Sequence, residues 1–405
     1  MAISLQAPIN LLPVSGIRIA TAAAGIKYKD RDDLVLFELS EGSSTAVVLT
    51  KNQFCAAPVE ITRKHLKVST PKYLLINSGN ANAGLGKQGI ADAEQTCATL
   101  ASEVNCVDSE VLPFSTGVIG ELLPVEKITK SLPVLLKALN GDAWLSAAKA
   151  IMTTDTVTKG YSEKINLDEN EILITGIAKG AGMIRPDMAT MLAYVATDLN
   201  INNGSLCDLL EQAVDQSFHC ITVDGDTSTN DSCVLVATGK SNLGFNDLSK
   251  QAKEKFVTAL NSIFLKLAQS IIRDGEGITK YISVKVEQAK SKSIAREIAF
   301  TIAHSPLVKT AAFASDPNWG RILAAAGRAT KEPMQIRNIS LYINGLNVID
   351  HGELADGYSE KSGQKEMQKD EIQFCLQLDE GGFGATVWTT DLSYDYVKIN
   401  AEYRT

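Results

Sequence analysis

Short apolar segments alternate with longer amphipathic segments along the whole chain. The short segments are rich in Val, Ile and Tyr, the composition that β-strands favour. The last of them, 394–403, alternates apolar and polar residues, so one of its faces would be apolar and the other polar. We expect strands at 34–39, 45–49, 73–76, 172–175, 193–196, 233–237, 282–286, 339–343, 386–388 and 394–403.

Four longer segments repeat their apolar residues every three or four positions, which predicts amphipathic helices. In the longest of them, Phe256, Leu260 and Ile263 share one face. Pro133 is expected to kink or split another, because proline lacks the N–H that a helix interior uses. The helices are expected at 94–104, 125–139, 205–218 and 248–272.

The composition is that of a globular protein. The chain has 405 residues, of which 45% are hydrophobic and 21% charged, and this is enough for one large core or two domains. Its net charge of −8 argues against nucleic acid or an anionic membrane surface as a partner. No apolar run approaches the roughly 20 residues that span a bilayer, and no secretory signal is visible at the N-terminus. We therefore expect a cytoplasmic protein, with an organelle as the alternative in a eukaryote.

Cysteine and histidine spacings give no sign of a metal site. The seven cysteines are an odd number without a CxxC pair, which predicts reduced, mostly buried thiols. The four histidines lie in no metal-binding motif. Residues 224–231 resemble a calcium loop in composition, but they lack its central glycine and its terminal glutamate. Residues 77–84 are expected to form a tight loop after a strand, without the residue order of a phosphate-binding loop.

The strongest chemical signal is a glycine-rich approach to an Ala-Thr bond near the middle of the chain. Residues 179–192 read Lys-Gly-Ala-Gly-Met-Ile-Arg-Pro-Asp-Met-Ala-Thr-Met-Leu. Cleavage between Ala189 and Thr190 would free a threonine whose α-amine, with a pKa of about 8, lies beside its own hydroxyl and can act as its base. Taken alone, such a stretch is more often a turn that leads into a strand.

A second signal is Ser115-Thr116-Gly117, which follows a short strand-like segment. The N–H of Gly117 and the side chain of Thr116 could donate hydrogen bonds to an oxyanion, and one such donor is commonly worth ~10²–10³ in rate. The same residue types also form ordinary turns that bond to their own backbone. The sequence around these residues leaves both interpretations open.

Six blocks, in this order, resemble the ornithine acetyltransferase family of arginine biosynthesis, whose members make N-acetylglutamate. The resemblance implies a mixed α/β fold of layered sheets flanked by helices, similar to self-processing N-terminal-nucleophile proteins. It also implies self-cleavage into fragments 1–189 and 190–405, which would assemble as a heterotetramer with two copies of each. Because a strand-like segment follows Thr190 directly, we expect the two fragments to share a sheet. The blocks are 114–120, 152–156, 179–192, 273–277, 316–321 and 396–405.

The resemblance also implies roles for single residues. Thr190 would be the nucleophile, and Thr116 and Gly117 would form the oxyanion hole. Lys179 suits the α-carboxylate of a substrate, and Glu276 suits the side-chain ammonium of ornithine, although the glycines beside Glu276 could equally mark the end of a helix. The implied substrate contacts are Thr154, Lys179, Thr190, Glu276, Asn400 and Thr405.

The implied reaction moves the acetyl group of N2-acetylornithine to glutamate through an acetyl-Thr190 ester, with no metal or other cofactor. Two alternatives stay open: an N-terminal-nucleophile amidase or aminopeptidase with water as the acceptor, and a self-cleaving binding protein without turnover. Members of the family divide into those that also acetylate glutamate from acetyl-CoA and those that only recycle acetyl groups. No residue decides between these two kinds, so acetyl-CoA remains an optional co-substrate.

Overall fold

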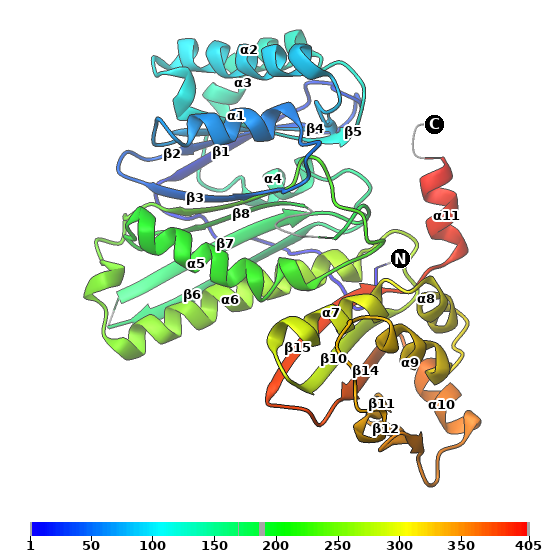
Figure 1. Cartoon of the computed structure of the whole chain (residues 1–405). Helices are drawn as coiled ribbons and strands as arrows, with labels where there is room; N and C mark the ends of the chain where they lie inside the picture. The colour runs from blue at the N-terminus through cyan, green and yellow to red at the C-terminus, as the bar shows by residue number, and fades with distance from the viewer. Residues whose placement is uncertain (1, 169, 186–190, 403–405) are drawn as a thin grey trace. The chain divides into compact units, whose positions relative to one another are not determined.

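The computed structural model describes residues 2–168, 170–185 and 191–402 (Figure 1). Ala189, Thr190 and Thr405, three residues of the expected site, lie outside these ranges. By its internal contacts the chain forms two compact units, each described here by itself. The larger unit comprises Gln6–His219 and Asp226–Ile271, and the smaller unit comprises Met1–Leu5, Cys220–Gly225 and Ile272–Thr405.

The larger unit contains two sheets. The first has the strand order β1-β2-β4-β5, in which only β4 and β5 run parallel. The second has the order β3-β9-β8-β7-β6, in which only β8 and β9 run parallel. The strands are β1 (Ile17–Ala22), β2 (Leu34–Leu39), β3 (Ser44–Leu49), β4 (Tyr73–Asn80), β5 (Val111–Val118), β6 (Lys159–Leu167), β7 (Asn170–Lys179), β8 (Leu192–Thr197) and β9 (Ser232–Ala237).

Helices cover the outer faces of the two stacked sheets (Figure 1). Buried residues of α1, α2 and α3 pack with those of the first sheet, and α5 and α6 pack on the second. Strands on both sides of residue 190 belong to the second sheet, because β7 pairs with β8. The helices are α1 (Ala57–His65), α2 (Gly86–Val104), α3 (Val125–Ala138), α4 (Trp144–Ala150), α5 (Asn203–Asp215) and α6 (Lys250–Arg273), which ends in the smaller unit.

An aromatic cluster lies in the core between the two sheets. The ring of Phe37 in β2 stacks on that of Tyr194 in β8, with centroids 5.4 Å apart, and meets the ring of Trp144 edge-on at 5.5 Å. Phe114 of β5 contacts Tyr194 edge-on as well. These rings belong to the buried cluster that joins both sheets, so the cluster fixes one sheet against the other.

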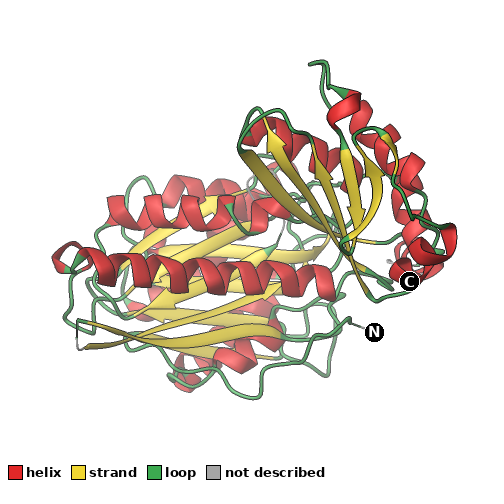
Figure 2. Ribbon diagram, turned by 90° about the horizontal axis from the view of Figure 1, so that it is seen from below, coloured by secondary structure: helices red, strands yellow, loops and turns green. Residues whose placement is uncertain are grey.

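The smaller unit is built on one six-stranded sheet, which Figure 2 shows together with its helices. The strand order is β13-β12-β11-β14-β10-β15, and β10 and β14 run parallel. Helices α7 to α10 share one buried core with this sheet. The elements are β10 (Tyr281–Ala289), α7 (Lys292–Ala303), α8 (Pro306–Phe313), α9 (Trp319–Gly327), β11 (Ser340–Ile343), β12 (Leu346–Asp350), β13 (Glu353–Leu354), α10 (Glu360–Met367), β14 (Glu371–Gln377), β15 (Phe383–Thr390) and α11 (Tyr394–Ala401).

The expected mixed α/β fold of layered sheets flanked by helices is confirmed. All four expected helices are present, and α3 continues through Pro133 without being split, since this proline lies on the exposed face of the helix. The seven cysteines are free thiols, as their spacing predicted, but the expectation that most are buried is wrong, because only Cys97 and Cys233 lie in the core. Within the described part of the chain, no helix is both long enough and apolar enough to cross a membrane.

The expected strand at 394–403 is wrong, because residues Tyr394–Ala401 form helix α11. Ser393 caps this helix by accepting a hydrogen bond from the N–H of Tyr396. None of the residues of α11 is buried. The alternating apolar residues therefore do not pack against a sheet, which is the contact that would stabilise a strand here. Local capping therefore decides the conformation here.

Tyr194 offers a test of the core. Its hydroxyl is buried without a hydrogen-bond partner among the described residues, and burial raises the pKa of this phenol. Because an unpaired buried polar group costs about 1–3 kcal/mol, Tyr194→Phe should leave the free energy of unfolding unchanged or raise it by about 1 kcal/mol. Tyr194→Ala should lower it by about 3–5 kcal/mol. Urea unfolding measures both variants, and a Phe variant as unstable as the Ala variant would contradict this account.

Candidate active site

Strands β4 and β5 approach each other so closely at their ends that only glycine fits. Gly117 in β5 has a φ of +137° and Gly79 in β4 has a φ of +97°. A Cβ added to Gly117 would lie 2.2 Å from the carbonyl carbon of Gly79. Any larger residue at position 117 would therefore push the two strands apart.

This pairing corrects two expectations. Residues 77–80 lie in β4 and are not part of a loop, and 115–117 continue β5 and do not form a turn. The physical reason is that each segment finds its backbone partner in the other, although the two are far apart in the sequence. Thr116 and Gly117 are thus held on a strand, which is a more rigid support than the expected turn.

Lys179, the last residue of β7, reaches the predicted oxyanion residues. Its Nζ donates a hydrogen bond of 3.2 Å to Oγ1 of Thr116. A hydroxyl that accepts a hydrogen bond from an ammonium is polarised and becomes a stronger donor itself. The structure therefore brings together two predicted site residues that come from different sequence blocks and different sheets.

The buried carboxylate of Asp155 ties together the segments around Lys179. Its Oδ1 accepts hydrogen bonds from Nζ of Lys159 at 2.7 Å and from the N–H of Gly180 at 2.6 Å, and its Oδ2 accepts one from the N–H of Thr153 at 3.0 Å. The side chains of Asp155 and Lys159 are both fully buried. Burial alone would raise the pKa of Asp155, but the charges of Lys159 and Lys179 and these hydrogen bonds hold it below its usual range.

Thr154 lies in the turn that Asp155 holds, between α4 and β6, and is half-buried. Asp155 belongs to the block 152–156, whereas Lys159 lies outside the six blocks. A lysine in the first position of a strand carries no signal of burial in the sequence. The one sequence feature that indicates an ion pair is Asp155, which lies four residues before Lys159.

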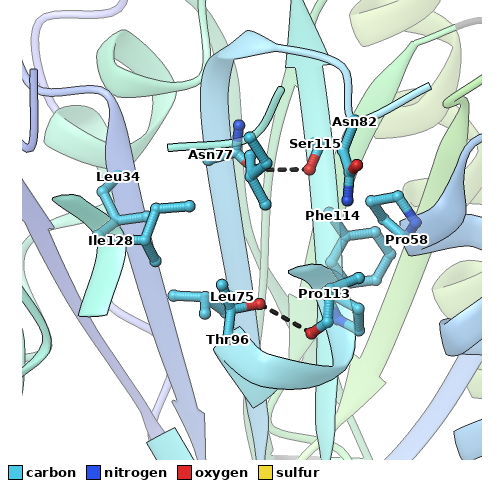
Figure 3. Close-up of a pocket in the computed structure, with 12 residues that line it drawn as sticks. Leu34, Pro58, Leu75, Asn77, Asn82, Thr96, Pro113, Phe114, Ser115 and Ile128 are labelled. Carbon is cyan, nitrogen blue, oxygen red and sulfur yellow. Dashed lines mark hydrogen bonds between the residues drawn. The ribbon is translucent and has the colours of Figure 1, made fainter. Parts of the chain in front are cut away.

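A polar network supports the ends of β4 and β5, and Figure 3 shows its hydrogen bond between Ser115 and Asn77. Oγ of Ser115 donates to Oδ1 of Asn77 at 2.5 Å, and the amide of Asn77 donates to the carbonyl of Asn80 at 2.8 Å. Nδ2 of Asn230 donates to the carbonyls of Ala81 at 2.6 Å and Ser115 at 2.9 Å. A small cavity beside this network is lined by Leu34, Pro58, Leu75, Asn77, Asn82, Ala93, Thr96, Pro113, Phe114, Ser115, Leu123 and Ile128.

The block 224–231, which resembled a calcium loop in composition, has a structural role through Asn230. Its neighbours are bonded to the segment before α1: the carbonyl of Asp231 accepts from the N–H of Thr50, and that of Thr229 accepts from the N–H of Ala56. Among the described residues, no group of three or more His, Cys, Asp or Glu side chains could hold a metal ion.

The chain on either side of the predicted nucleophile is held in the larger unit. The carbonyl of Arg185 accepts a hydrogen bond from Oγ1 of Thr227, and that of Met191 accepts one from the N–H of Ser232. Leu192, two residues after Thr190 in the sequence, pairs directly with Lys179 across β7 and β8. The roles of Ala189 and Thr190 concern residues outside the described ranges and stay predictions.

The smaller unit brings together Glu276 and Asn400. Nδ2 of Asn400 in α11 donates a hydrogen bond of 2.9 Å to Oε2 of Glu276, whose side chain is buried. The hydroxyl of Tyr396, also in α11, donates to Oδ2 of Asp224 at 3.2 Å. The helix that replaced the expected strand thus presents Asn400 to the predicted ammonium-binding carboxylate. Thr405 lies beyond the described residues, so its role stays a prediction.

The family model and the curated relatives agree on one family. The model of the ArgJ family matches residues 18–405. The arginine biosynthesis bifunctional protein ArgJ of Methylococcus capsulatus is 51% identical over 397 residues, which cover 98% of this chain and 97% of that protein. The protein of the same name from Psychrobacter arcticus is 48% identical over 402 residues and covers 99% of each. The crystal structure of ornithine acetyltransferase from Mycobacterium tuberculosis, complexed with ornithine, is 34% identical over 44% of this chain and 94% of that chain, with a TM-score of 0.38.

The pair of Asp155 and Lys159 predicts a specific pattern of stability. Asp155→Asn removes the buried carboxylate that pairs with the ammonium of Lys159, which should cost about 3–5 kcal/mol in urea unfolding. Adding Lys159→Met removes the other charge of this pair, so the double variant should recover much of the loss. A double variant that is less stable than Asp155→Asn would contradict the assignment.

The same pair makes the folding stability of the chain depend on pH. The pKa of Asp155 is lower in the folded chain than in the unfolded one, so its contribution is present above about pH 4 and is lost as the pH falls towards the folded value. Wild-type stability should therefore fall on acidification more steeply than that of the double variant. Equal slopes for the two proteins would contradict this account.

Proposed function

The chain belongs to the ArgJ family, and we propose that it is a self-cleaving acetyltransferase that moves the acetyl group of N2-acetylornithine to glutamate in arginine biosynthesis. The observation that carries this proposal is the hydrogen bond from Lys179 to Thr116. It brings a cation and a polarised hydroxyl to the strand that begins two residues after Thr190.

Self-cleavage would come first. Oγ of Thr190 attacks the carbonyl carbon of Ala189, and the acyl group passes from nitrogen to oxygen to give an ester. Water then hydrolyses this ester, which leaves a carboxylate on Ala189 and a free α-amine on Thr190. The hydrogen bonds of Arg185 and Met191 support this step, because they fix the chain before and after this segment.

Acetyl transfer would use the same hydroxyl. The α-amine of Thr190 takes the proton of Oγ as Oγ attacks the acetyl carbon of N2-acetylornithine. The C–N bond breaks, ornithine leaves with that proton on its amine, and an acetyl ester remains. The neutral amine of glutamate then attacks the ester, the bond from the acetyl carbon to Oγ breaks, and the proton that the new amide loses returns to Oγ through the α-amine of Thr190. Thr116 and Gly117 would donate hydrogen bonds to the oxyanion in both steps.

Charge complementarity supports the choice of substrate. Lys179 would pair with the α-carboxylate that N2-acetylornithine and glutamate share, and Glu276 with the side-chain ammonium of the ornithine moiety. Asn400 already donates to Glu276, which orients the carboxylate and leaves its second oxygen for the ligand. The roles of Thr154 and Thr405 in binding rest on the resemblance alone.

Further features follow from the family and extend the proposal. The relatives are named bifunctional proteins, and we propose acetyl-CoA as a second acetyl donor, from which the same hydroxyl would take the acetyl group as the C–S bond breaks. We also propose a cytoplasmic heterotetramer with two copies each of fragments 1–189 and 190–405. The reaction needs no metal and no ATP, because the ester keeps the transfer potential of the acetyl group.

The acceptor is the most direct test of the proposed reaction. Purified protein is mixed with N2-acetylornithine, with and without glutamate and in the absence of CoA, and the products are separated. Acetylglutamate and ornithine should form only when glutamate is present. Lys179→Met should slow this reaction by roughly 10²-fold, because it removes both the carboxylate partner and the contact with Thr116.

Two controls sharpen the outcome. Lys149→Met removes another lysine of the larger unit, one that is exposed on α4, and should leave the rate unchanged. Acetate and ornithine formed at the same rate without glutamate would mean that water is the acceptor. An amidase would then replace the transferase in this proposal.

A further inference from the structure

Lys309 in α8 is a buried cation of the smaller unit with three hydrogen-bond acceptors around it. Only 5% of the residue is exposed. Its Nζ donates to Oγ1 of Thr389 at 3.1 Å, to Oγ1 of Thr390 at 3.2 Å and to the carbonyl of Thr390. Three acceptors match the three protons of an ammonium, so this lysine fixes the end of β15.

The segment that Lys309 fixes packs against the loop of Glu276. A Cβ added to Gly275 would lie 2.7 Å from Cγ2 of Thr390, so the loop and the strand end are in close contact. Asp391, the next residue, accepts hydrogen bonds through Oδ1 from the N–H groups of Thr279 at 2.9 Å and Lys280 at 3.0 Å. The far side of the loop is therefore held by the same segment.

Ser393 completes the frame on the side of α11. Its Oγ donates a hydrogen bond of 2.6 Å to the carbonyl of Gly277 and caps the helix that carries Asn400. Gly277 has a φ of +66°, and a Cβ there would lie 2.3 Å from the backbone nitrogen of Tyr396. Glu276 thus lies between two glycines that both press against residues 390–396.

We propose that Lys309 is a positioning residue for ammonium recognition: it holds residues 389–393, and through them it fixes Glu276 against Asn400, where the side-chain ammonium of the ornithine moiety would bind. This inference rests on the proposed function and deepens it. Lys309 is buried behind the loop, so it acts through its neighbours and does not touch the substrate.

The charge of Lys309 is the property that matters for this role. Burial lowers the pKa of Lys309 to about 8, while the carboxylates of Asp391 and Asp224 act in the opposite direction. The titratable group on the neighbouring element is His304 at the end of α7, whose Nε2 lies 3.0 Å from Oγ1 of Thr222. Above about pH 8 the ammonium loses a proton, so one of its three hydrogen bonds is lost, and the buried carboxylate of Asp391 and the half-buried carboxylate of Asp224 lose a nearby positive charge.

Deprotonation of Lys309 changes folding stability in the opposite direction to ammonium recognition, so the two effects can be told apart. The pKa of Lys309 is lower in the folded chain than in the unfolded one, so between about pH 8 and 10.5 the unfolded chain binds more protons. Titration of this lysine therefore adds to stability as the pH rises through that window. A loss of ammonium recognition in the same window would not come from this group unfolding the chain.

The test compares two donors that differ only in the ammonium. N2-acetylnorvaline has the carbon chain of N2-acetylornithine without the terminal amine, so the ratio of the two kcat/KM values measures ammonium recognition. Lys309→Met should lower that ratio roughly tenfold at pH 7, mostly through the KM for acetylornithine, and should leave self-cleavage intact. Lys361→Met, at an exposed lysine of the same unit, is the matched control and should not change the ratio.

The pH profile of the wild-type chain is a second measurement that needs no variant. Its ratio should fall between about pH 7 and 9, a range in which the side-chain amine of ornithine stays protonated. The ratio of Lys309→Met should be low throughout and independent of pH. If that variant does not fold, a falling wild-type ratio still supports the inference and a constant one overturns it.

The remaining outcomes separate this inference from the proposed function. A wild-type chain that uses both donors, with an unchanged ratio in Lys309→Met, would overturn the positioning role alone. Equal losses with both donors would mean that Lys309 only maintains the fold, and would also overturn it. A wild-type chain that uses neither donor would overturn the proposed function and this inference with it.

Discussion

The buried carboxylate of Asp155 is the interaction on which the larger unit's site depends. It joins the turn that contains Thr154, the first residue of β6 and the glycine that follows Lys179. A carboxylate in such a place would be protonated without nearby cations, so the ammonium of Lys159 is needed to keep it charged. The backbone at Lys179 is held by its pairing with Leu192 and by the bond from Gly180 to Asp155, and from this position Lys179 donates to Thr116.

The smaller unit has a comparable arrangement with the charges reversed, because a buried cation supports the segment that contains an anionic residue. There the residue to be fixed is the carboxylate Glu276, and a buried lysine fixes it indirectly through hydroxyls, a carbonyl and the neighbouring Asp391. In each unit a buried lysine thus fixes the backbone, and a different charged group is the one proposed to bind the substrate. In the proposed reaction the two units would also have separate tasks, since the residues proposed for acyl chemistry lie in one unit and those proposed for the side-chain ammonium lie in the other.

The sequence predicted those parts of the fold that depend on local pattern. Strand 34–39 was predicted with the bounds of β2, because five of its six residues are large and apolar. Segments 77–84 and 115–117 were assigned to a loop and a turn, because Gly, Asn, Ser and Thr favour turns unless a distant strand pairs with them. Thr116 and Lys179 could be found from their motifs, whereas the burial of Lys159 and Lys309 depends on partners that no local pattern reveals.

The central claim is that Thr190 is both the product of cleavage and the carrier of the acetyl group, and intact-mass analysis tests it most directly. The purified protein should contain two chains, 1–189 and 190–405. With N2-acetylornithine alone, the second chain should gain one acetyl group on Thr190, and glutamate should remove it. A single uncleaved chain that still transfers acetyl groups, or two chains of which neither is ever acetylated during turnover, would contradict the account.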